Sequence, residues 1–402
     1  MPDSAAAAPT ISLRCLRAAI AVADQGSTAA AARALHGTQS SMARAVTQLE
    51  QMLGVDLFHR SAQGMTSTAA GASLLKRGRD ALAHLARADA GPWQVPLRGG
   101  HLAAQVSAQQ LKTVILLART SSQRQAAASL GVSQAAVHQV LVRVEHLAGE
   151  RLFDRLASGL RPTSRGEWVA NQGELALAQL RAMAEEAAAI SGSICGRIAI
   201  GTLPYSTGRV VPSAIQRLTS RWSGLEVSVV DGTYDSLIAK LRQAEIDIMV
   251  GALRPEAPRD LKQESLFDDP LALIVRAGHP LLAQRGLRLP RLGTEPWVLP
   301  MPGSPAWNAL ADAFEHHALP VPQGVYVNSP TLACSMLQQS DRIALMPPSQ
   351  WRKELDVGLL AILQVRLRHA SRSIGFTVRA GFAPTPALSL FEKALREAAH
   401  EG

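Results

Sequence analysis

The chain has 402 residues, of which 47% are apolar, 18% charged and 4% aromatic. This length favours about three domains with separate cores, and the composition excludes a disordered chain. The low aromatic content argues against a stacking platform for single-stranded nucleic acid. Arg14, Arg17 and Asp24 interrupt the apolar stretches near the N-terminus, and no apolar run is long enough to span a bilayer. We therefore expect a cytoplasmic protein that neither is exported nor contacts a membrane.

The formal net charge of +9 is confined to the first part of the chain. Residues 1–166 contain 18 lysines and arginines against 9 acidic residues, whereas residues 167–402 contain 23 of each kind. A randomly basic protein would spread the excess more evenly. The distribution favours a polyanion-binding part joined to a neutral part that has another task.

One segment of the sequence occurs twice, and every matching pair of residues is separated by 95 positions. The constant offset indicates duplication of a folded unit, because a shared helical period alone would drift out of register. The matched pairs are Ala31 and Ala126, Ala32 and Ala127, Leu35 and Leu130, Gln39 and Gln134, Glu50 and Glu145, Gly54 and Gly149, Leu57 and Leu152, Phe58 and Phe153, Arg60 and Arg155, Gly64 and Gly159, Thr68 and Thr163, and Gly71 and Gly166.

The first copy of this repeat predicts three short helices followed by a two-stranded hairpin. The predicted elements are helices over 13–25 and 28–35, a third helix that Thr38 caps, and a hairpin over 59–66. Gly26 and Ser27 end the first helix and cap the second. Apolar residues recur with helical spacing after Thr38, so that one face of the third helix is buried and the other exposed. The pattern predicts a winged helix-turn-helix.

The exposed face of the third helix carries short polar side chains and an arginine. Short side chains let a helix approach the major groove closely, glutamine can bond an adenine edge at two points, and arginine can reach guanine or a phosphate. A solvated helix surface is the simpler alternative for either copy alone, but the duplication and the basic charge favour DNA. The candidate DNA-binding residues are Thr38, Gln39, Ser40, Ser41, Arg44 and Arg60 in the first copy, and Ser133, Gln134, Ala135, Ala136, His138, Gln139 and Arg155 in the second.

Both copies resemble the N-terminal domain of LysR-type transcriptional regulators, which implies a tandem duplication of that domain. Residues 13–71 carry the resemblance through Gly26-Ser27, Ala31-Ala32-x-x-Leu35, Thr38-Gln39-Ser40-Ser41, Leu49-Glu50-x-x-Leu53-Gly54, Leu57-Phe58-x-Arg60 and Thr68-x-x-Gly71. Residues 111–166 carry it through Leu130-Gly131-Val132-Ser133-Gln134-Ala135-Ala136-Val137. The family usually has proline where Ser40 and Ala135 stand. Gln139 replaces the arginine that survives as Arg44, so the two copies need not bind DNA equally.

Glycine and proline clusters and two long amphipathic helices predict the domain boundaries. The predicted domains are a first winged helix-turn-helix with a trailing helix over 11–90, a Gly/Pro linker over 91–106, a second winged helix-turn-helix over 107–166, a linker helix over 167–192 and an effector-binding domain over 196–402. In the family, the helix over 167–192 pairs with that of a partner subunit, which implies a homodimer or homotetramer. An ordinary intramolecular core helix is the alternative.

Strands and helices alternate after Gly196, which predicts a parallel sheet covered by helices. The predicted elements are strands over 197–202, 225–230 and 246–251, helices over 210–222 and 235–243, strands over 271–275, 297–299, 325–327 and 343–346 with helices beginning near Pro305 and Pro330, and a final strand and helix over 373–379 and 385–399. This part resembles the two-lobed effector domain of the same regulators, which is similar to periplasmic solute-binding proteins. The resemblance rests on Gly196-x-Ile198-x-Ile200-Gly201, Glu245-Ile246-Asp247-Ile248, Gly278-His279-Pro280-Leu281 and Ile343-Ala344-Leu345-Met346-Pro347. It implies a lobe I over 196–253 and 366–402 and a lobe II over 254–365.

In such a fold, a ligand lies between the lobes at the carboxyl ends of the strands, where helix N-termini offer backbone N–H groups. Hydroxyl-bearing residues at these positions suit a carboxylate, an aromatic acid or a sugar derivative. Each such residue alone is more often a helix cap or a turn residue. The candidate effector-binding residues are Thr202, Tyr205, Ser206, Thr207, Thr233, Ser304, Ser329 and Thr331.

The sequence contains no pattern of catalytic or metal-binding residues. It lacks a Gly-x-Ser-x-Gly elbow, a phosphate loop and metal-ligand spacing, so we expect neither enzyme activity nor a cofactor or metal. The 3 cysteines are far apart and predict no disulfide framework; redox sensing through Cys195 and Cys334 is an alternative to simple burial. The expected partners are double-stranded promoter DNA, a small-molecule effector and RNA polymerase. A structural DNA-bridging protein with a ligand-free C-terminal half is the alternative function.

Overall fold

The computed structural model describes residues 11–61, 64–91, 101–157, 159–205, 208, 210–367 and 370–401. The chain divides into two compact units. The first comprises Met1–Gly196 with Pro384–Ala387, and the second comprises Arg197–Ala383 with Leu388–Gly402. Within the described ranges, no helix is both long enough and apolar enough to cross a membrane.

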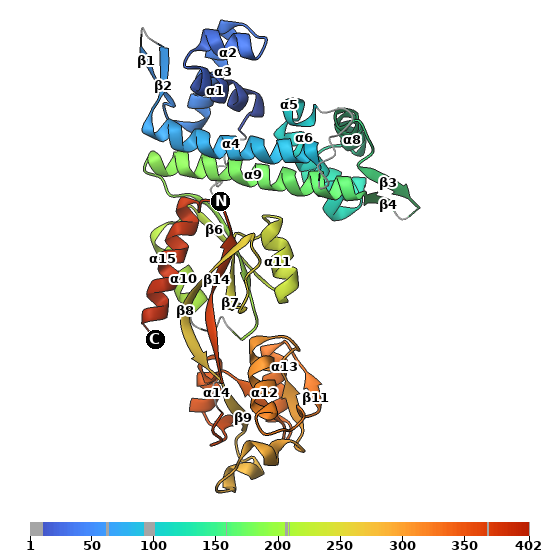
Figure 1. Cartoon of the computed structure of the whole chain (residues 1–402), viewed down its shortest axis with the longest axis vertical. Helices are drawn as coiled ribbons and strands as arrows, with labels where there is room; N and C mark the ends of the chain where they lie inside the picture. Colours follow the sequence, from blue (N-terminus) through green and yellow to red (C-terminus); the bar gives the residue numbers. More distant parts are fainter. Residues whose placement is uncertain are drawn as a thin grey trace. The chain divides into compact units, whose positions relative to one another are not determined.

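The first copy of the repeat folds as a winged helix-turn-helix followed by a long helix (Figure 1). Its elements are α1 (Leu13–Gln25), α2 (Thr28–Ala34), α3 (Gln39–Leu53), β1 (Phe58–Ser61), β2 (Gly64–Ser67) and α4 (Ala69–Ala90). Gly26 ends α1 with a φ of 71°, and the Ser27 hydroxyl accepts a hydrogen bond from the N–H of Ala30 at the start of α2. Val46 and Leu49 of α3 are buried in the core that these helices share. The predicted helix-turn-helix is confirmed.

The second copy repeats this arrangement and adds one short helix in front of it. Its elements are α5 (Leu102–Gln105), α6 (Ala108–Thr120), α7 (Gln123–Leu130), α8 (Gln134–Ala148), β3 (Phe153–Leu156), β4 (Gly159–Pro162) and α9 (Ser164–Ile190). Equivalent hydrogen bonds attach the second wing strand in each copy. The N–H of Met65 donates to the carbonyl of Gly26, and that of Leu160 donates to the carbonyl of Ser121, both at 2.9 Å. The duplication is therefore one of structure as well as of sequence.

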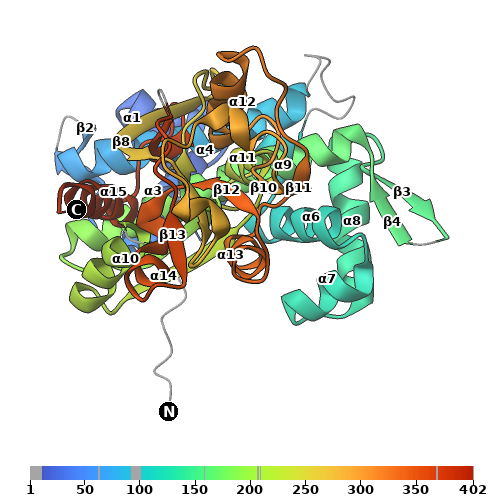
Figure 2. The same cartoon turned by 90° about the horizontal axis from the view of Figure 1, so that it is seen from below.

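The two long helices α4 and α9 lie side by side within the first unit (Figures 1 and 2). The facing sides consist of small and aliphatic residues, and Ala81 and Leu85 of α4 and Ala176 and Leu180 of α9 are all buried. In this single chain, α4 therefore covers a face of α9, which corresponds to the intramolecular alternative left open by the sequence.

Lobe I of the second unit is a five-stranded sheet with the strand order β6-β5-β7-β14-β8. Its strands are β5 (Gly196–Thr202), β6 (Leu225–Asp231), β7 (Ile248–Ala252), β8 (Leu261–Pro270) and β14 (Ser371–Arg379), and its helices are α10 (Val210–Arg221), α11 (Tyr234–Arg242) and α15 (Pro386–His400). β5 and β7 are parallel, whereas β14 is antiparallel to both β7 and β8. The C-terminal strand thus returns to the first lobe, as predicted.

Lobe II is a second five-stranded sheet with the order β11-β10-β12-β9-β13. Its elements are β9 (Ala272–Arg276), η1 (Pro280–Ala283), η2 (Leu289–Leu292), β10 (Trp297–Leu299), α12 (Pro305–Glu315), β11 (Gly324–Tyr326), α13 (Pro330–Gln338), β12 (Ile343–Met346), η3 (Pro348–Trp351), α14 (Arg352–Asp356) and β13 (Leu360–Ile362). The chain passes between the lobes twice, from β8 to β9 and from β13 to β14.

Two expectations about the second unit are corrected. Neither sheet is purely parallel, because β14 and β8 in lobe I and β9 and β13 in lobe II run antiparallel to their neighbours. β8 lies in the sheet of lobe I, although residues 254–365 were expected to form lobe II. β8 and β13 were not predicted as strands, and β8 is rich in charged residues and shows no regular alternation of burial. The fold class is nevertheless confirmed: two winged helix-turn-helix regions, a long helix and a two-lobed α/β domain.

Candidate nucleic-acid interface and effector site

The third helix of the first copy, α3, carries the candidate base contacts and is called the reading helix; it begins with a capping box. The Thr38 hydroxyl accepts a hydrogen bond from the N–H of Ser41 at 3.2 Å, and the Ser41 hydroxyl donates to the Thr38 carbonyl at 2.7 Å. These two candidate residues therefore define the helix start. Gln39 and Arg44 are exposed, and their side chains make no hydrogen bond within the described residues. Ser40 is also exposed, and its hydroxyl lies 3.2 Å from that of Thr38.

The reading helix of the second copy, α8, has a simpler start and a less polar face. The Ser133 hydroxyl accepts a hydrogen bond from the N–H of Ala136 at 3.1 Å. Gln134, Ala135 and Gln139 are exposed, whereas Ala136 and His138 are half-buried. The candidate residues thus share one end of the helix, but two of them are alanines and the arginine of the first copy is absent.

A glutamate supports the wing in each copy, Glu50 being buried and Glu145 half-buried, and the sequence showed the pair only as members of the repeat. Glu50 accepts hydrogen bonds from the N–H groups of Leu57 at 3.0 Å and of Phe58 at 3.3 Å. Glu145 repeats the contacts with Leu152 at 2.8 Å and Phe153 at 3.2 Å. A carboxylate that accepts two backbone N–H groups fixes the strand that follows the reading helix.

The candidate arginines at the wing base differ between the copies. The side chain of Arg60 is 63% exposed and forms an ion pair with Glu50 at 3.0 Å. Arg155 is exposed, and no ion pair with Glu145 is present among the described residues. Arg60 is therefore held in place by the same carboxylate that supports the wing, whereas Arg155 is not.

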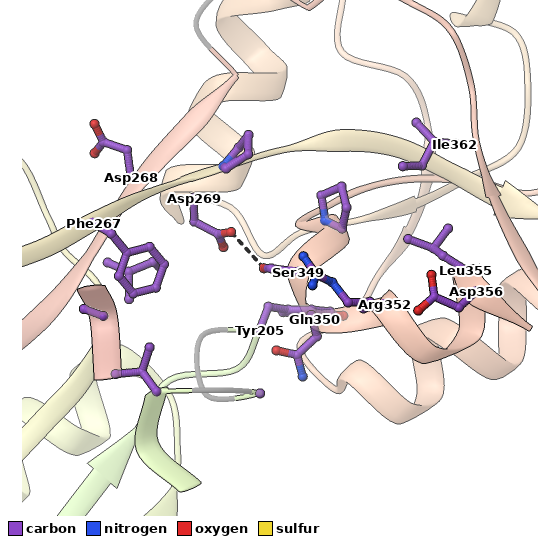
Figure 3. Close-up of a pocket in the computed structure, with 16 residues that line it drawn as sticks. Tyr205, Phe267, Asp268, Asp269, Ser349, Gln350, Arg352, Leu355, Asp356 and Ile362 are labelled. Carbon is purple, nitrogen blue, oxygen red and sulfur yellow. Dashed lines mark hydrogen bonds between the residues drawn. The ribbon is translucent and has the colours of Figure 1, made fainter. Parts of the chain in front are cut away.

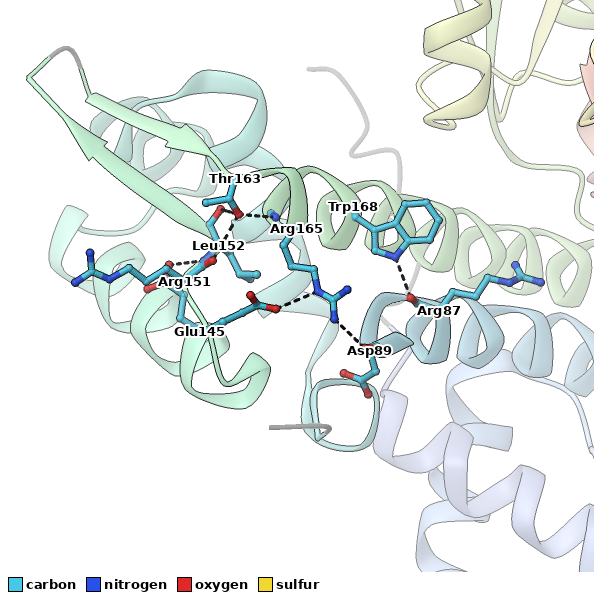
Figure 4. Close-up of polar contacts among 10 residues, drawn as sticks. Arg87, Asp89, Glu145, Arg151, Leu152, Thr163, Arg165 and Trp168 are labelled. Atoms are coloured by element: carbon cyan, nitrogen blue, oxygen red, sulfur yellow. Dashed lines mark hydrogen bonds and ion pairs between the residues drawn. The ribbon is translucent and has the colours of Figure 1, made fainter. Parts of the chain in front are cut away.

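A polar cluster joins the end of α4 to the second copy (Figure 4). The Arg165 guanidinium donates to the carbonyl of Asp89 at 3.1 Å and lies 3.2 Å from a carboxylate oxygen of Glu150. The Trp168 indole N–H donates to the carbonyl of Arg87 at 2.9 Å. These contacts bring donors to two carbonyl groups in the last turn of α4, that of Asp89 and that of Arg87, which also accepts a hydrogen bond from the N–H of Gly91. No pattern in the sequence indicated this cluster.

The candidate effector residues serve mainly as helix caps in this structure. The hydroxyls of Thr233, Ser304 and Ser329 accept hydrogen bonds from the N–H groups of the third residue of α11, α12 and α13, respectively. Thr331 is exposed in the first turn of α13. Thr202 is buried, and its hydroxyl donates to Asp231. Ser206 and Thr207 lie outside the described residues.

Among the candidate effector residues that the structure describes, Tyr205 is the one that connects the two lobes. Its hydroxyl donates to the carbonyl of Ser329 at 3.3 Å, and its ring lies 6.5 Å from that of Trp351. The backbone of Tyr205 has a φ of 61°, in the left-handed region that is unusual for a residue with a side chain. Burial raises the pKa of its hydroxyl to about 12, although the positive charge of Arg372 opposes this shift.

A buried ion pair lies beside Tyr205, where the two lobes meet. The guanidinium of Arg372 donates to Asp269 at 2.8 Å, and the side chains are only 4% and 5% exposed. Arg372 also donates to the carbonyl of Tyr205, and the Ser349 hydroxyl donates to Asp269 at 2.8 Å. Burial lowers the pKa of Arg372, and its hydrogen bonds to Asp269 oppose that shift. Nothing in the sequence singled out Asp269, Ser349 or Arg372.

A cavity of about 620 Å³ opens next to this ion pair. Figure 3 shows that the labelled side chains come from both lobes and include acidic, basic, amide and aromatic groups. The labelled residues are Tyr205, Phe267, Asp268, Asp269, Ser349, Gln350, Arg352, Leu355, Asp356 and Ile362. Its size is within the range of small-molecule sites, and it combines apolar walls with a few polar groups. Of the candidate effector residues described by the structure, only Tyr205 lines it.

The cysteines do not form a cluster in the structure. Cys15 and Cys334 are buried and Cys195 is half-buried, and all three are free thiols. Burial raises the pKa of Cys334, which disfavours its reactive thiolate form.

The sequence matches two family descriptions over most of its length. The family of bacterial regulatory helix-turn-helix proteins of the lysR type matches residues 13–72 and again residues 108–167. The LysR substrate binding domain matches residues 191–400. The duplicated unit and the two-lobed domain therefore each have a family counterpart.

Similar proteins include one regulator about as long as this chain and one that is shorter. The transcriptional regulator GalR of Pseudomonas putida is 33% identical over 385 residues, which cover 95% of this chain and 96% of GalR. The regulator PcaQ of Agrobacterium fabrum is 28% identical over 299 residues, which cover 74% of this chain and 96% of PcaQ. PcaQ is thus shorter than this chain by about one copy of the repeat.

Solved structures with a similar fold include two full-length regulators. A full-length OxyR variant from Pseudomonas aeruginosa gives a TM-score of 0.58 at 22% identity, covering 73% of this chain and 96% of OxyR. CbnR, described as a LysR family transcriptional regulator, gives a TM-score of 0.53 at 19% identity, covering 73% of this chain and 99% of CbnR. From the family matches and the full-length similarity to GalR, this chain belongs to the LysR family of DNA-binding transcriptional regulators.

Proposed function

We propose that this regulator binds specific DNA sequences and is controlled by a small molecule held between the lobes of its second unit. The observation that carries the proposal is the presence, in one chain, of two exposed reading faces and a polar cavity lined by both lobes. The assignment of individual residues to DNA and to effector belongs to this proposal.

The first reading face supports base recognition by its chemistry. Gln39 and Arg44 lie in the first turns of α3 with exposed side chains, whose donor and acceptor groups have no hydrogen-bond partner among the residues that the structure describes. Glutamine suits the adenine edge and arginine the guanine edge in the major groove. Arg60, held by Glu50 at 3.0 Å, is placed beside the helix as a candidate phosphate contact. The second face offers Gln134 and Gln139 for bases and Arg155 for a phosphate.

The cavity supports an effector that carries both hydroxyl groups and a carboxylate. Asp268 and Asp356 can accept hydrogen bonds from hydroxyl groups, and Arg352 can pair with a carboxylate. Phe267 and Tyr205 supply aromatic surface against which a ring or a carbon skeleton can pack. A sugar acid or a hydroxylated aromatic acid combines these features.

Effector binding at this cavity would act on the contact between the lobes. Ser349 from lobe II donates to Asp269 of lobe I, and Tyr205 of lobe I donates to the Ser329 carbonyl of lobe II. A ligand that competes for Asp269 or for Tyr205 changes the balance between open and closed lobes, because it binds one arrangement better than the other.

The DNA part of the proposal is tested by selecting duplexes from a randomised library with the full-length chain. We expect enrichment of a defined sequence, protected from cleavage by the wild type and less so by an Arg44→Ala variant. Exposed Arg291 in η2 provides the control, because Arg291→Ala removes the same charge from the second unit. If no sequence is enriched at any salt concentration, the proposal of sequence-specific binding is wrong.

The effector part is tested by thermal unfolding of the full-length chain in the presence of sugar acids and hydroxylated aromatic acids. A ligand at 100 times its Kd raises the free energy of unfolding by about 2.7 kcal/mol. We expect one of these compounds to raise the Tm of the wild type and of Arg291→Ala, but not that of Arg352→Ala. If no compound raises the Tm of the wild type and none changes its affinity for DNA, the alternative of a DNA-bridging protein with a ligand-free second half is favoured.

A further inference from the structure

The helices α4 and α9 pair in an antiparallel manner within one chain. Near one end of the pair, Ser73 and Arg77 of α4 both contact Glu186 of α9. Farther along, His84 lies 2.9 Å from Gln172. The cluster in Figure 4 closes the other end. Residue numbers rise along α4 while those of its contacts in α9 fall.

The register of this pairing is centred on equivalent residues of the two copies. The offset of 95 makes Gln172 the counterpart of Arg77. When both helices are numbered as in the first copy, the contact of His84 with Gln172 therefore joins positions 84 and 77. These positions flank Ala81, whose counterpart is Ala176, and both alanines are 0% exposed. The inward faces match along their length. α9 has further buried residues, but the positions buried in both helices are Gly71, Leu74, Leu75, Arg77, Gly78, Ala81, Leu85 and Ala88 in α4, and their counterparts Gly166, Val169, Ala170, Gln172, Gly173, Ala176, Leu180 and Met183 in α9.

Each winged helix-turn-helix packs against its own long helix in the same way. A Cβ added to Gly78 would meet the side chains of Leu16 and Ile20, and a Cβ added to Gly173 would meet those of Leu111 and Ile115, their counterparts. An antiparallel pair of equivalent helices, each with an equivalent domain attached, has an approximate twofold axis through its centre. The two reading helices are therefore related by a rotation of about half a circle around this axis.

We propose that a single chain binds both halves of an inverted repeat in duplex DNA, and that the two halves differ in sequence. Two readers related by half a turn recognise the same kind of sequence on opposite strands, which is an inverted repeat. In this chain the second reader comes from the same polypeptide, so no partner subunit is needed for it. The inference deepens the proposed DNA-binding function and rests on it.

The charged residues of the helix pair favour α4 against α9 over two copies of either helix. Arg77 pairs with Glu186, and both side chains are largely buried, at 8% and 18% exposure. In a pair of two α9 helices with the same register, Glu186 would instead face Gln172, the counterpart of Arg77. In a pair of two α4 helices, Arg77 would face Gly91, the counterpart of Glu186. Either homotypic pair loses the ion pair.

The polar cluster of Figure 4 adds a second preference for the same pairing. Arg165 and Trp168 bond carbonyl groups at the end of α4. Their counterparts in α4 are Ala70 and Ser73, which are too short to reach a neighbouring helix end in this way. Within the described part of the chain, the cluster lies at the end where α4 of the first copy meets the second copy.

The halves of the DNA site differ because the reading faces differ. Arg44 in the first copy corresponds to Gln139 in the second, and Ser40 corresponds to Ala135. All four side chains are exposed. Arginine favours guanine and glutamine favours adenine in the major groove. We therefore expect a guanine in one half-site at the position where the other half-site has adenine.

Co-expression of two variants, each altered in one winged helix-turn-helix domain, tests whether both DNA-binding domains come from one chain. Duplexes are first selected from a randomised library with the wild-type, full-length chain. Arg44→Ala and Gln134→Ala chains, each with one impaired reader, are then tested alone and after co-expression. We expect each variant to bind the selected duplex about tenfold more weakly. Each variant should leave a different half-site unprotected, and the co-expressed sample should bind no more tightly than either variant alone. Restored wild-type affinity in the co-expressed sample would overturn the inference, because readers would then be combined between chains.

The selected sequences and a cross-link provide independent measurements. Identical halves, or a single half-site, would also overturn the inference, whereas failure to enrich any sequence would instead count against the proposed function. Ser73→Cys with Glu186→Cys, in a Cys195→Ser background, is treated with a short bismaleimide. We expect an internally linked monomer from the double variant and no covalent dimer from a co-expressed mixture of the single variants. A covalent dimer from that mixture would show pairing between chains.

Discussion

Gly71 and Gly166, at equivalent positions of the two copies, each lie against the backbone of the leucine that precedes the wing. A Cβ at either position would stand 2.0 Å from a carbonyl oxygen, that of Leu57 in the first copy and that of Leu152 in the second. A backbone carbonyl cannot move aside as a side chain can. The close approach therefore fixes how each wing meets its long helix.

Alanine at either glycine is expected to destabilise the first unit. Gly71→Ala and Gly166→Ala should each lower the free energy of unfolding by about 2 kcal/mol, because overpacking forces backbone shifts. Gly173→Ala is the control. Its Cβ would lie 3.2 Å from the flexible end of Leu111, and alanine gains about 1 kcal/mol over glycine inside a helix. Chemical denaturation of the three variants measures the difference, and equal losses for all three would contradict it.

The repeat explains why so much of the first unit could be predicted. Caps such as Ser27 and Thr38 and the glycines at helix ends act locally, so their positions are visible in the sequence. The pairing of α4 with α9 was not predictable in the same way. Both helices have an apolar stripe, and a stripe does not reveal whether its partner lies in the same chain. Contacts between residues far apart in the sequence distinguish the cases, such as that of Arg77 with Glu186, 109 positions apart, and that of Trp168 with Arg87.

Of the residues around the cavity between the lobes, the sequence indicated few, for a physical reason. Hydroxyls at strand ends were expected to face a ligand, but Thr233, Ser304 and Ser329 cap helices instead. The buried ion pair joins Asp269 at the end of β8 to Arg372 at the start of β14, two neighbouring strands of lobe I. β8 has no regular alternation, so neither the strand nor the position of its carboxylate could be placed from local pattern.

Loss of Asp269 is expected to destabilise the second unit strongly. Asp269→Asn removes the negative charge from a guanidinium that is buried, and leaving one partner of a buried pair uncompensated costs about 3–5 kcal/mol. Asp260→Asn is the matched control, because Asp260 pairs with Arg242 at 2.7 Å while both side chains are about half exposed, at 54% and 47%. That change should cost less than about 1 kcal/mol. Similar losses for both variants in urea unfolding would refute the assignment.

Tyr205 is expected to make stability depend on alkaline pH. Its pKa is raised to about 12 by burial, whereas an unfolded tyrosine titrates near 10. Below pH 10 both states keep the proton, so its contribution is fully present. As pH rises from about 10 to about 12, the unfolded state gains by losing the proton and stability falls.

The phenolate absorbance of the folded chain measures this titration. The wild type should show a component near pH 12 that Tyr205→Phe lacks, and the fall in Tm above pH 10 should be smaller in the variant. Tyr326→Phe serves as the control, because Tyr326 is 49% exposed. An unchanged titration curve in Tyr205→Phe would show that the buried hydroxyl does not titrate as inferred.

The two candidate contacts of the second copy are expected to affect DNA binding differently. Arg155→Ala removes an exposed charge beside the wing, so affinity should fall almost equally for all sequences, and the slope of log K against log salt concentration should decrease by about one. Gln139→Ala changes no charge. It should leave the salt slope unchanged and cost about 1–3 kcal/mol only on duplexes that carry the preferred base. Binding isotherms at several salt concentrations, on the selected duplex and on one altered base pair, separate the two effects. If both variants reduce the salt slope alike, the second copy contacts the phosphate backbone without reading bases, and the two halves of the site would not be distinguished by this helix.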